Sequence, residues 1–240
     1  MLPSMQLRGL LLRYSLLLRT SKALFAEFLG TAVLVAAVIG SGIMAQSLTS
    51  DRALQLLINA LSTILALGVL IWLLTELSGA HFNPIVSIAA AIRKDLSPLH
   101  MVGFVIAQFL GGLAGTALAN AMFAHHLIEV SHHHRSGHAL LLGEVVATCG
   151  LVLVIFSKVS SNRPMYLLVP AWIGSAYFFT SSTSFANPAV TLARVWSNSF
   201  AGIAPASLLP FIGAELFGGA LGLVFASLLF GQREKKRHSG

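Results

Sequence analysis

The chain has 240 residues, of which 56% are hydrophobic and only 10% are charged, and its mean hydropathy is +0.82. Soluble domains carry about 25% charged residues, so 15 basic and 8 acidic side chains are too few to cover one of this length. The composition therefore excludes a soluble enzyme, a disordered chain and a nucleic-acid-binding domain, despite a pI near 10.2. The basic excess is instead typical of membrane-protein loops, where lysine and arginine cluster between apolar segments.

Six apolar segments are long enough to cross a hydrocarbon core of ~30 Å, which takes about 20 helical residues. They are Ala23–Ala45, Ala53–Leu77, Leu99–Phe123, Ala139–Phe156, Met165–Thr183 and Ser207–Phe230. Between these segments, one side of the membrane receives only Arg52, Arg135 and Arg194, and all other basic residues fall on the side of the two termini. Because basic loops stay in the cytoplasm, we expect both termini there, with a bacterial inner membrane as the location.

Residues 1–22 precede the first span and are basic and rich in leucine. Three arginines interrupt the apolar run, which makes it a poor hydrophobic region for a signal peptide. Two interpretations stay open, an interfacial amphipathic helix or a translation start placed too early. The chain thus divides into this N-terminal segment, a membrane domain over residues 23–231 and a basic cytoplasmic tail over residues 232–240.

Three short motifs recur in the same order in the two halves of the membrane domain. Ala26–Thr31 matches Gly143–Thr148, Ala80–Ser87 matches Ser184–Thr191, and Ala107–Gly112 matches Ala214–Gly219. The halves, residues 23–124 and 138–231, contain three spans each. Since three is odd, the second half must enter the membrane in the opposite orientation, which gives an inverted repeat of the kind found in channels and transporters.

Each half also contains an apolar segment too short to span, His81–Arg93 and Phe185–Trp196. A dozen residues reach ~18 Å as a helix, about half of the hydrocarbon core. Each segment holds an Asn-Pro pair, in which Asn suits the N-cap and Pro the first helical turn. The inverted repeat brings the two helix N-termini face to face, so that their partial positive charges repel cations and their Asn amides donate to a hydroxyl oxygen. The two motifs are Asn83-Pro84-Ile85 and Asn187-Pro188-Ala189.

These paired motifs, together with Ser78–Pro84 and the three-plus-three layout, resemble the aquaporin (major intrinsic protein) family over about residues 23–231. The resemblance implies an all-α membrane protein with six transmembrane helices and two re-entrant half-helices in an inverted repeat. It also implies a passive channel without a cofactor, assembled as a homotetramer with one pore per subunit. The partners implied are small neutral solutes and the lipid bilayer.

The resemblance further implies a narrow selectivity filter on the outer side of the paired asparagines. Counting from the two motifs assigns Thr63, Ser175, Ser184 and Val190 to it. Val190 occupies the position at which the family almost always has arginine. We therefore predict a wide, uncharged filter that passes solutes larger than water. Arg194, one helical turn beyond Val190, is interpreted as an ordinary interfacial arginine in preference to a charge at the pore mouth.

Three titratable residues within the membrane domain need a separate interpretation. Glu27 and Glu144 occupy equivalent positions of the repeat. We expect them to accept hydrogen bonds from the re-entrant loops rather than to carry protons. His81 is expected to hold its loop, with a pH sensor on the cytoplasmic side as the alternative.

The connection between the halves contains six histidines within 14 residues, at positions 125, 126, 132, 133, 134 and 138. Of these, His132, His133 and His134 are weak candidates for a metal site, because histidine clusters bind zinc or nickel. Few acidic or thiol ligands lie nearby, and the preferred interpretation is a solvated loop without a metal.

The segment Thr180–Thr191 resembles a bacterial branch of the family that is associated with arsenic resistance. For that branch the implied solutes are arsenous acid and small methylated arsenicals. The predicted function is a passive channel for water, glycerol-like polyols and, on this resemblance, arsenicals. Two alternatives stay open, a proton-coupled secondary transporter that uses Glu27 or Glu144, and a strict water channel. An enzyme is not expected, because the spans contain no nucleophile–base pair or metal-binding triad.

Overall fold

A computed structural model describes residues 2–157 and 163–231, with side chains from Leu18 onward. Within these ranges the chain is all-helical and forms no strand, in agreement with the predicted fold class. Its elements are α1 (Leu2–Leu48), α2 (Arg52–Ser78), α3 (Pro84–Ile92), α4 (Pro98–Met122), α5 (His138–Phe156), α6 (Met165–Phe179), α7 (Pro188–Ala193), the 3-10 turn η1 (Arg194–Trp196) and α8 (Pro205–Phe230).

Five of the six predicted spans form helices that are long and apolar enough to cross a membrane, within α1, α2, α4, α5 and α8. The remaining span was predicted over Met165–Thr183, but α6 ends at Phe179 and its 15 residues reach only ~22 Å. The helix ends where a run of Ser and Thr begins. At Thr180 the backbone is extended and the hydroxyl bonds back to the Ala176 carbonyl, so the side chain competes with helical hydrogen bonding.

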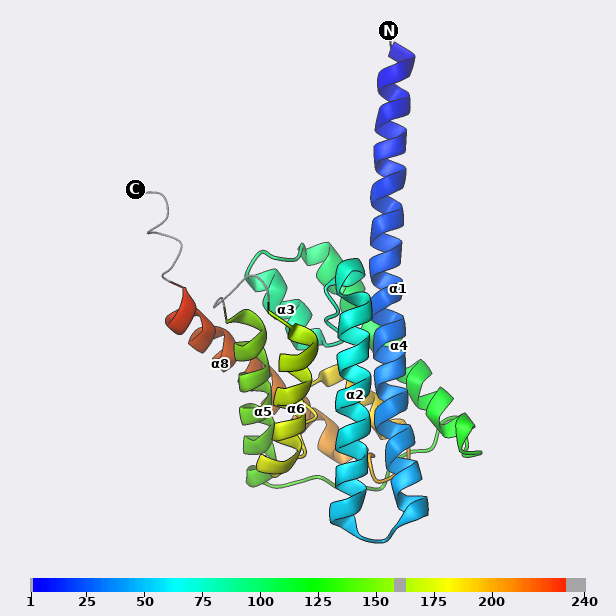
Figure 1. The fold of residues 1–240 in the computed structure, drawn as a ribbon, viewed down its shortest axis with the longest axis vertical. Helices are drawn as coiled ribbons and strands as arrows, with labels where there is room; N and C mark the ends of the chain where they lie inside the picture. The colour runs from blue at the N-terminus through cyan, green and yellow to red at the C-terminus, as the bar shows by residue number, and fades with distance from the viewer. Residues whose placement is uncertain (1, 158–162, 232–240) are drawn as a thin grey trace.

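The first helix is continuous from Leu2 to Leu48, and its first turns project beyond the rest of the bundle (Figure 1). The backbone of residues 2–22 therefore continues the first membrane helix, with no break at the predicted boundary of the N-terminal segment. The predicted tail over residues 232–240 lies outside the described residues.

The inverted repeat is visible in how the long helices pair. α1 packs most extensively against α4. Their counterparts in the second half, α5 and α8, pack against each other in the same way. Glycines make this close approach possible: a Cβ at Gly111 or Gly115 of α4 would overlap backbone atoms of α1, and a Cβ at Gly218 or Gly222 of α8 would overlap those of α5. Small residues of this spacing bring the backbones of membrane helices together.

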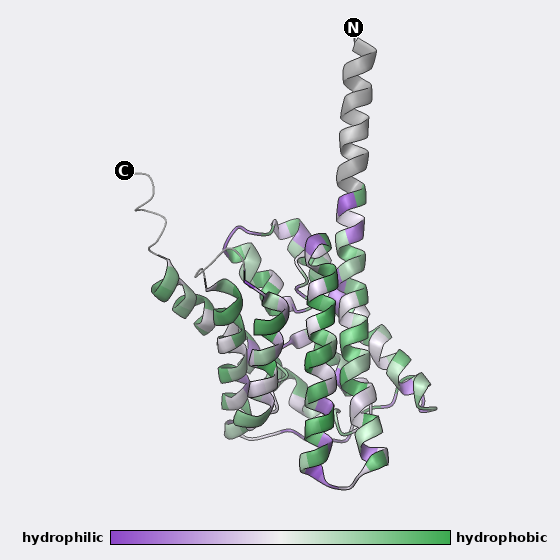
Figure 2. Ribbon diagram, in the orientation of Figure 1, coloured by the Kyte–Doolittle hydropathy of each residue, from purple (hydrophilic) through white to green (hydrophobic). Residues whose placement is uncertain are grey.

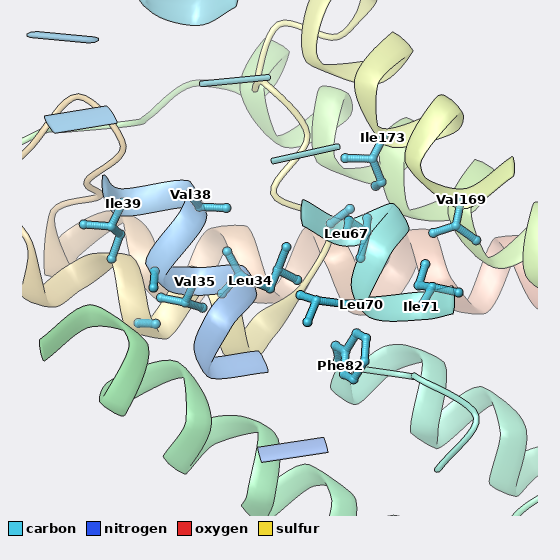
Figure 3. Close-up of a cluster of buried hydrophobic side chains, with 14 of the residues drawn as sticks. Leu34, Val35, Val38, Ile39, Leu67, Leu70, Ile71, Phe82, Val169 and Ile173 are labelled. Atoms are coloured by element: carbon cyan, nitrogen blue, oxygen red, sulfur yellow. The ribbon is translucent and has the colours of Figure 1, made fainter. Parts of the chain in front are cut away.

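The buried apolar residues line the inner sides of α1, α2 and α6 (Figure 3). Leu34 and Val38 of α1 face Leu67 of α2, and Ile173 of α6 lies beside them. The outer sides of the helices are also apolar, with hydrophilic residues gathered mainly in the connections at the two ends of the bundle (Figure 2). A bundle that is apolar inside and outside is a membrane protein, because lipid replaces water on its outer face.

Candidate solute pore

Both Asn-Pro pairs begin short helices, as the sequence predicted. Asn83 caps α3, and its Oδ1 accepts a hydrogen bond of 2.9 Å from the Ile85 N–H. Asn187 caps α7, and its Oδ1 accepts hydrogen bonds of 3.0 and 3.3 Å from the N–H groups of Ala189 and Val190. The proline in each pair occupies the first helical turn, where a missing N–H leaves no bond unmade.

The two half-helices are joined to each other through their asparagines. The Asn83 Nδ2 donates to the Ala186 carbonyl at 2.8 Å, and the Asn187 Nδ2 donates to the Phe82 carbonyl at the same distance. Each amide has two N–H hydrogens, so one hydrogen of each remains for a solute. Both asparagines line a cavity of about 380 Å³. The N-termini of α3 and α7 therefore meet at the wall of this cavity inside the bundle, as predicted from the inverted repeat.

Two buried glutamates hold the loops that lead into these half-helices. Glu27 accepts hydrogen bonds from the N–H groups of His81 and Phe82 at 2.9 and 2.7 Å. Glu144 accepts them from Phe185 and Ala186 at the same two distances. Irregular backbone at this depth needs internal partners for its N–H groups. Both carboxylates thus occupy the loop-anchoring position expected for them.

The His81 ring also contributes to its own loop. Its Nδ1 lies 3.0 Å from the Ser87 hydroxyl, and the ring packs edge-on against Phe104. The ring also lines the cavity. The position is consistent with the expected loop-holding role.

The predicted filter residues are only partly brought together. Thr63, Ser184 and Val190 line the cavity, but Ser175 is exposed on the outer face of α6 and does not. Residues four apart share a helix face, so Ile173 and Tyr177 point inward while Ser175 points away. Tyr177 is buried, lines the cavity and donates to the Thr63 hydroxyl at 3.3 Å. The assignment of Ser175 to the pore was therefore wrong, and Tyr177 takes its place on the wall.

Arg194 is a second correction, because it is 2% exposed and lines the cavity rather than the membrane interface. It begins the turn η1 directly after α7, one turn beyond Val190. Its guanidinium carbon lies 3.3 Å from the centre of the Phe185 ring, and its Nε donates to the Ala201 carbonyl. The wall therefore carries a positive charge, which the prediction of an uncharged filter did not include.

Arg135, from the connection between the halves, adds a second guanidinium beside the same ring. Its guanidinium carbon lies 5.0 Å from the centre of the Phe185 ring, and it donates to the Gly202 and Phe200 carbonyls at 2.9 and 3.1 Å. Burial lowers the pKa of Arg135 to about 10, which leaves it charged at neutral pH. Sequence reasoning missed this residue, since its segment carries no motif.

The outer histidines do not form a metal site. Among the described residues, no group of three or more His, Cys, Asp or Glu side chains is placed to hold a metal ion, and the weak candidates His132, His133 and His134 are all exposed. The pKa of His133 is lowered to about 4, first by burial and then by the charges of Arg135, Arg194 and Arg52. His133 is therefore neutral at physiological pH, which leaves the positive charge at this end to arginine.

Known proteins are similar to this chain in sequence and in fold. The sequence profile of a family described as Major intrinsic protein matches residues 16–184. Aquaglyceroporin AqpS of Rhizobium meliloti (strain 1021) is 49% identical over 199 residues, which cover 82% of this chain and 85% of that protein. A probable TIP-type aquaporin of Medicago truncatula is 30% identical over 229 residues, or 87% of each chain. The X-ray structure of the aquaglyceroporin from Plasmodium falciparum has a TM-score of 0.64 over 87% of this chain and 95% of that one, with 21% identity, which is a likeness of fold.

Proposed function

Because this chain is an integral membrane protein of the major intrinsic protein family, we propose that it is a passive channel for water and small uncharged hydroxylated solutes such as glycerol. The observation that carries the proposal is the cavity in which Asn83 and Asn187 meet. Each asparagine is held by a loop carbonyl of the other half, with one N–H free to bind a solute oxygen. The name of the Rhizobium relative, an aquaglyceroporin, points to the same solutes.

Solute choice follows from the two kinds of side chain that line this cavity. Leu67, Ile71 and Val169 are apolar, and a carbon backbone lies against them without losing hydrogen bonds. The hydroxyl groups of the solute bind the amides of the asparagines and the terminal nitrogens of Arg194. Of the Arg194 nitrogens, only Nε has a hydrogen-bond acceptor within the described part of the chain. A polyol satisfies both sides, and arsenous acid belongs to the same class of small neutral hydroxylated solutes.

Cations are excluded by charge in this proposal. The N-termini of α3 and α7 present their partial positive charges to the same point, and the guanidinium of Arg194 adds a full charge to the wall. The proton-coupled alternative is disfavoured, because Glu27 and Glu144 are fully buried and bonded to loop N–H groups. A carboxylate held in this way cannot release its partners to carry a proton without opening the loop.

Assembly and placement complete the proposal. We infer a homotetramer in a bacterial inner membrane, with both termini and the loop at Arg93–Asp95 on the cytoplasmic side. Basic connections favour that orientation, and the exposed apolar faces of the helices suit contact with lipid or with neighbouring subunits.

The test is stopped-flow light scattering on proteoliposomes under gradients of water, glycerol or arsenous acid. We expect all three to pass, without accumulation against a gradient. Flux of water alone would favour the strict water channel, and accumulation driven by a proton gradient would favour the transporter. Either result overturns the proposal.

Val190→Arg tests the width of the outer wall in the same assay. The variant adds a second guanidinium next to Arg194 in a cavity of about 380 Å³. We expect glycerol flux to fall about tenfold or more, equivalent to ~1.4 kcal/mol of added barrier, with a smaller effect on water. Val190→Met is the matched control, since it adds length without charge. Equal losses of glycerol and water in Val190→Arg would mean that the variant blocks the pore outright rather than narrowing it.

A further inference from the structure

The two halves differ at one buried position behind their half-helices. In the first half the position is Gln108, which is fully buried. Its Nε2 donates to the Glu27 Oε2 at 2.7 Å and to the Ser87 hydroxyl at 3.0 Å. The amide therefore uses both of its hydrogens, one on the loop-anchoring carboxylate and one on the half-helix α3.

In the second half the equivalent position is Glu215, also fully buried. Its Oε1 accepts from the Thr191 hydroxyl at 2.5 Å and from the Asn187 N–H at 3.2 Å. Thr191 is the counterpart of Ser87 in the repeat. The Oε2 is buried and has no hydrogen-bond partner among the described residues. The Gln108 Oε1 is likewise buried without a partner among the described residues, so the two positions differ in their donors: the amide donates two hydrogen bonds, and a charged carboxylate can donate none.

The charges around Glu215 come from two elements. α5 brings Glu144, whose carboxylate repels a charged Glu215, and η1 brings Arg194, which attracts both. α5 also contains His138 and Cys149, but neither of them has an electrostatic effect on Glu215. Neither α3 nor α7 contains a titratable residue. Among the described residues, Arg194 forms no ion pair within 4 Å of a carboxylate, because its Nε bonds to the Ala201 carbonyl and its guanidinium lies on Phe185.

The charge of Arg135 also acts on Glu144, but among the described residues neither Arg135 nor Arg194 forms an ion pair within 4 Å of a carboxylate. Two buried carboxylates that repel each other without a directly paired cation are unfavourable if both are charged. A protonated carboxyl group removes the repulsion and gains an O–H donor. We propose that Glu215 is a positioning residue held as a neutral carboxylic acid, in which Oε1 fixes Asn187 and Thr191 and the hydroxyl on Oε2 replaces the Gln108 amide as a donor toward Glu144. The second half then has a donor toward its loop-anchoring glutamate, as the first half has in Gln108, whereas at the half-helix Gln108 donates to Ser87 and Glu215 accepts from Thr191.

The protonation state is tested by infrared difference spectroscopy of the purified channel in lipid. Subtracting the Glu215→Gln spectrum from the wild-type spectrum at pH 7 is expected to reveal the carbonyl band of one protonated acid. Gln108→Glu is the matched control, since it places a carboxyl at the counterpart position and is expected to add a second such band. A wild-type difference spectrum with carboxylate bands only would overturn the proposal, and this readout is independent of whether the channel conducts glycerol.

The positioning role is tested by glycerol flux, which rests on the proposed function. Glu215→Gln retains an oxygen for Asn187 and Thr191 and a donor for Glu144, so it is expected to rescue flux relative to Glu215→Leu. Glu215→Leu removes the acceptor, and we expect at least about a tenfold loss, the scale of one missing buried hydrogen bond. Raising the pH toward 10 is expected to lower wild-type flux but not that of Glu215→Gln. Equal flux in the Gln and Leu variants, or the same pH profile in wild type and Glu215→Gln, would contradict the role.

Discussion

The two halves of the repeat are alike in the contacts that hold the backbone and different in the side chains that line the cavity. In both, a glutamate anchors the loop, an asparagine caps the half-helix and glycines bring two long helices together. Along the cavity wall, however, Val86 and Ala90 of the first half correspond to Val190 and Arg194 of the second. These shared contacts form a symmetric frame. The charge of Arg194 makes one end of the cavity differ from the other.

The half-helices themselves reflect this difference. α3 is a regular α-helix of nine residues, whereas α7 has six and continues as the turn η1. A 3-10 turn is tighter than an α-helical one and changes the direction of the side chains that follow. Arg194 is the first residue of this turn. The second half therefore departs from α-helical geometry at the residue that brings a guanidinium to the cavity wall.

The largest expected effect tests the shared frame, by replacing either anchoring glutamate with leucine. Glu27→Leu and Glu144→Leu each leave two loop N–H groups buried without acceptors, at about 1–3 kcal/mol each, so unfolding should be easier by about 2–6 kcal/mol. The two losses should be similar, because each carboxylate has further donors. Glu27 also accepts from the Ser78 hydroxyl and the Gln108 amide, and Glu144 accepts from the Ser182 hydroxyl and, on the proposal above, from Glu215. Thermal unfolding in detergent, followed by circular dichroism, gives the measurement.

The control for this pair is Glu76→Leu, at an exposed acidic position of α2 that anchors no loop. It should unfold within a few degrees of wild type. If Glu144→Leu matched Glu76→Leu, the carboxylate would not be holding the second loop, and the symmetry of the two anchors would be only apparent.

The frame was largely predictable from sequence, because it depends on local signals repeated twice. The Asn-Pro pairs, the paired glutamates and the glycine spacing each have a direct backbone consequence, and the second copy identifies the partner of the first. Gln108 and Glu215 also align in the repeat, although their role needs the hydrogen bonds to be known.

The cavity wall was less predictable, since the direction of a side chain depends on how its helix is rotated about its axis. A fixed count from Asn187 selects Ser175, but the face of α6 that lines the cavity carries Ile173 and Tyr177 instead. Arg194 was assigned to the interface because the sequence gives no sign of the turn at η1. Arg135 reaches Phe185 from a connection without secondary structure, for which no periodicity exists to guide a prediction.

The glycine contacts provide a test of intermediate size. Gly111→Ala and Gly218→Ala each place a methyl group against the backbone of the partner helix, and we expect losses of about 1–3 kcal/mol in the free energy of unfolding. The two losses should be similar, since the packing is the same in both halves. Chemical unfolding in mixed micelles would measure them.

Gly213→Ala is the control for the glycine series. It lies in α8, and a Cβ there meets nothing within 4 Å. Alanine is the better helix former by about 1 kcal/mol, so this variant should be neutral or slightly more stable. A tolerated Gly111→Ala beside a damaging Gly218→Ala would mean that the two helix pairs are not packed alike.

The asymmetry of the wall is tested by removing its charge. Arg194→Ala gives the second half the alanine that the first half has at Ala90, and we expect proton leak to rise about tenfold, since ~1.4 kcal/mol of lost repulsion is sufficient. Proton flux into dye-loaded liposomes at a fixed membrane potential gives the measurement. Ala90→Arg is the reciprocal variant, which should lower glycerol flux without raising proton leak. Unchanged leak in Arg194→Ala would assign the whole barrier to the half-helix dipoles.

The smallest effect concerns the pH response of the charged end. The pKa of His133 is about 4 in the folded protein, below its ordinary value of 6.5, because of burial and the surrounding arginines. The unfolded chain therefore binds a proton at His133 before the folded chain does, and stability falls as the pH drops from about 6.5 toward 4.

His133→Gln should therefore narrow the gap between the unfolding temperatures measured at pH 7.5 and pH 5. The expected change is at most a few degrees, because His133 is exposed and solvent screens its charge. His132→Gln, at the neighbouring and equally exposed position, is the matched control. If both variants reduced the acid sensitivity equally, the effect would arise from the charge of the loop as a whole. The arginines beside Phe185 would then have no specific effect on the pKa of His133.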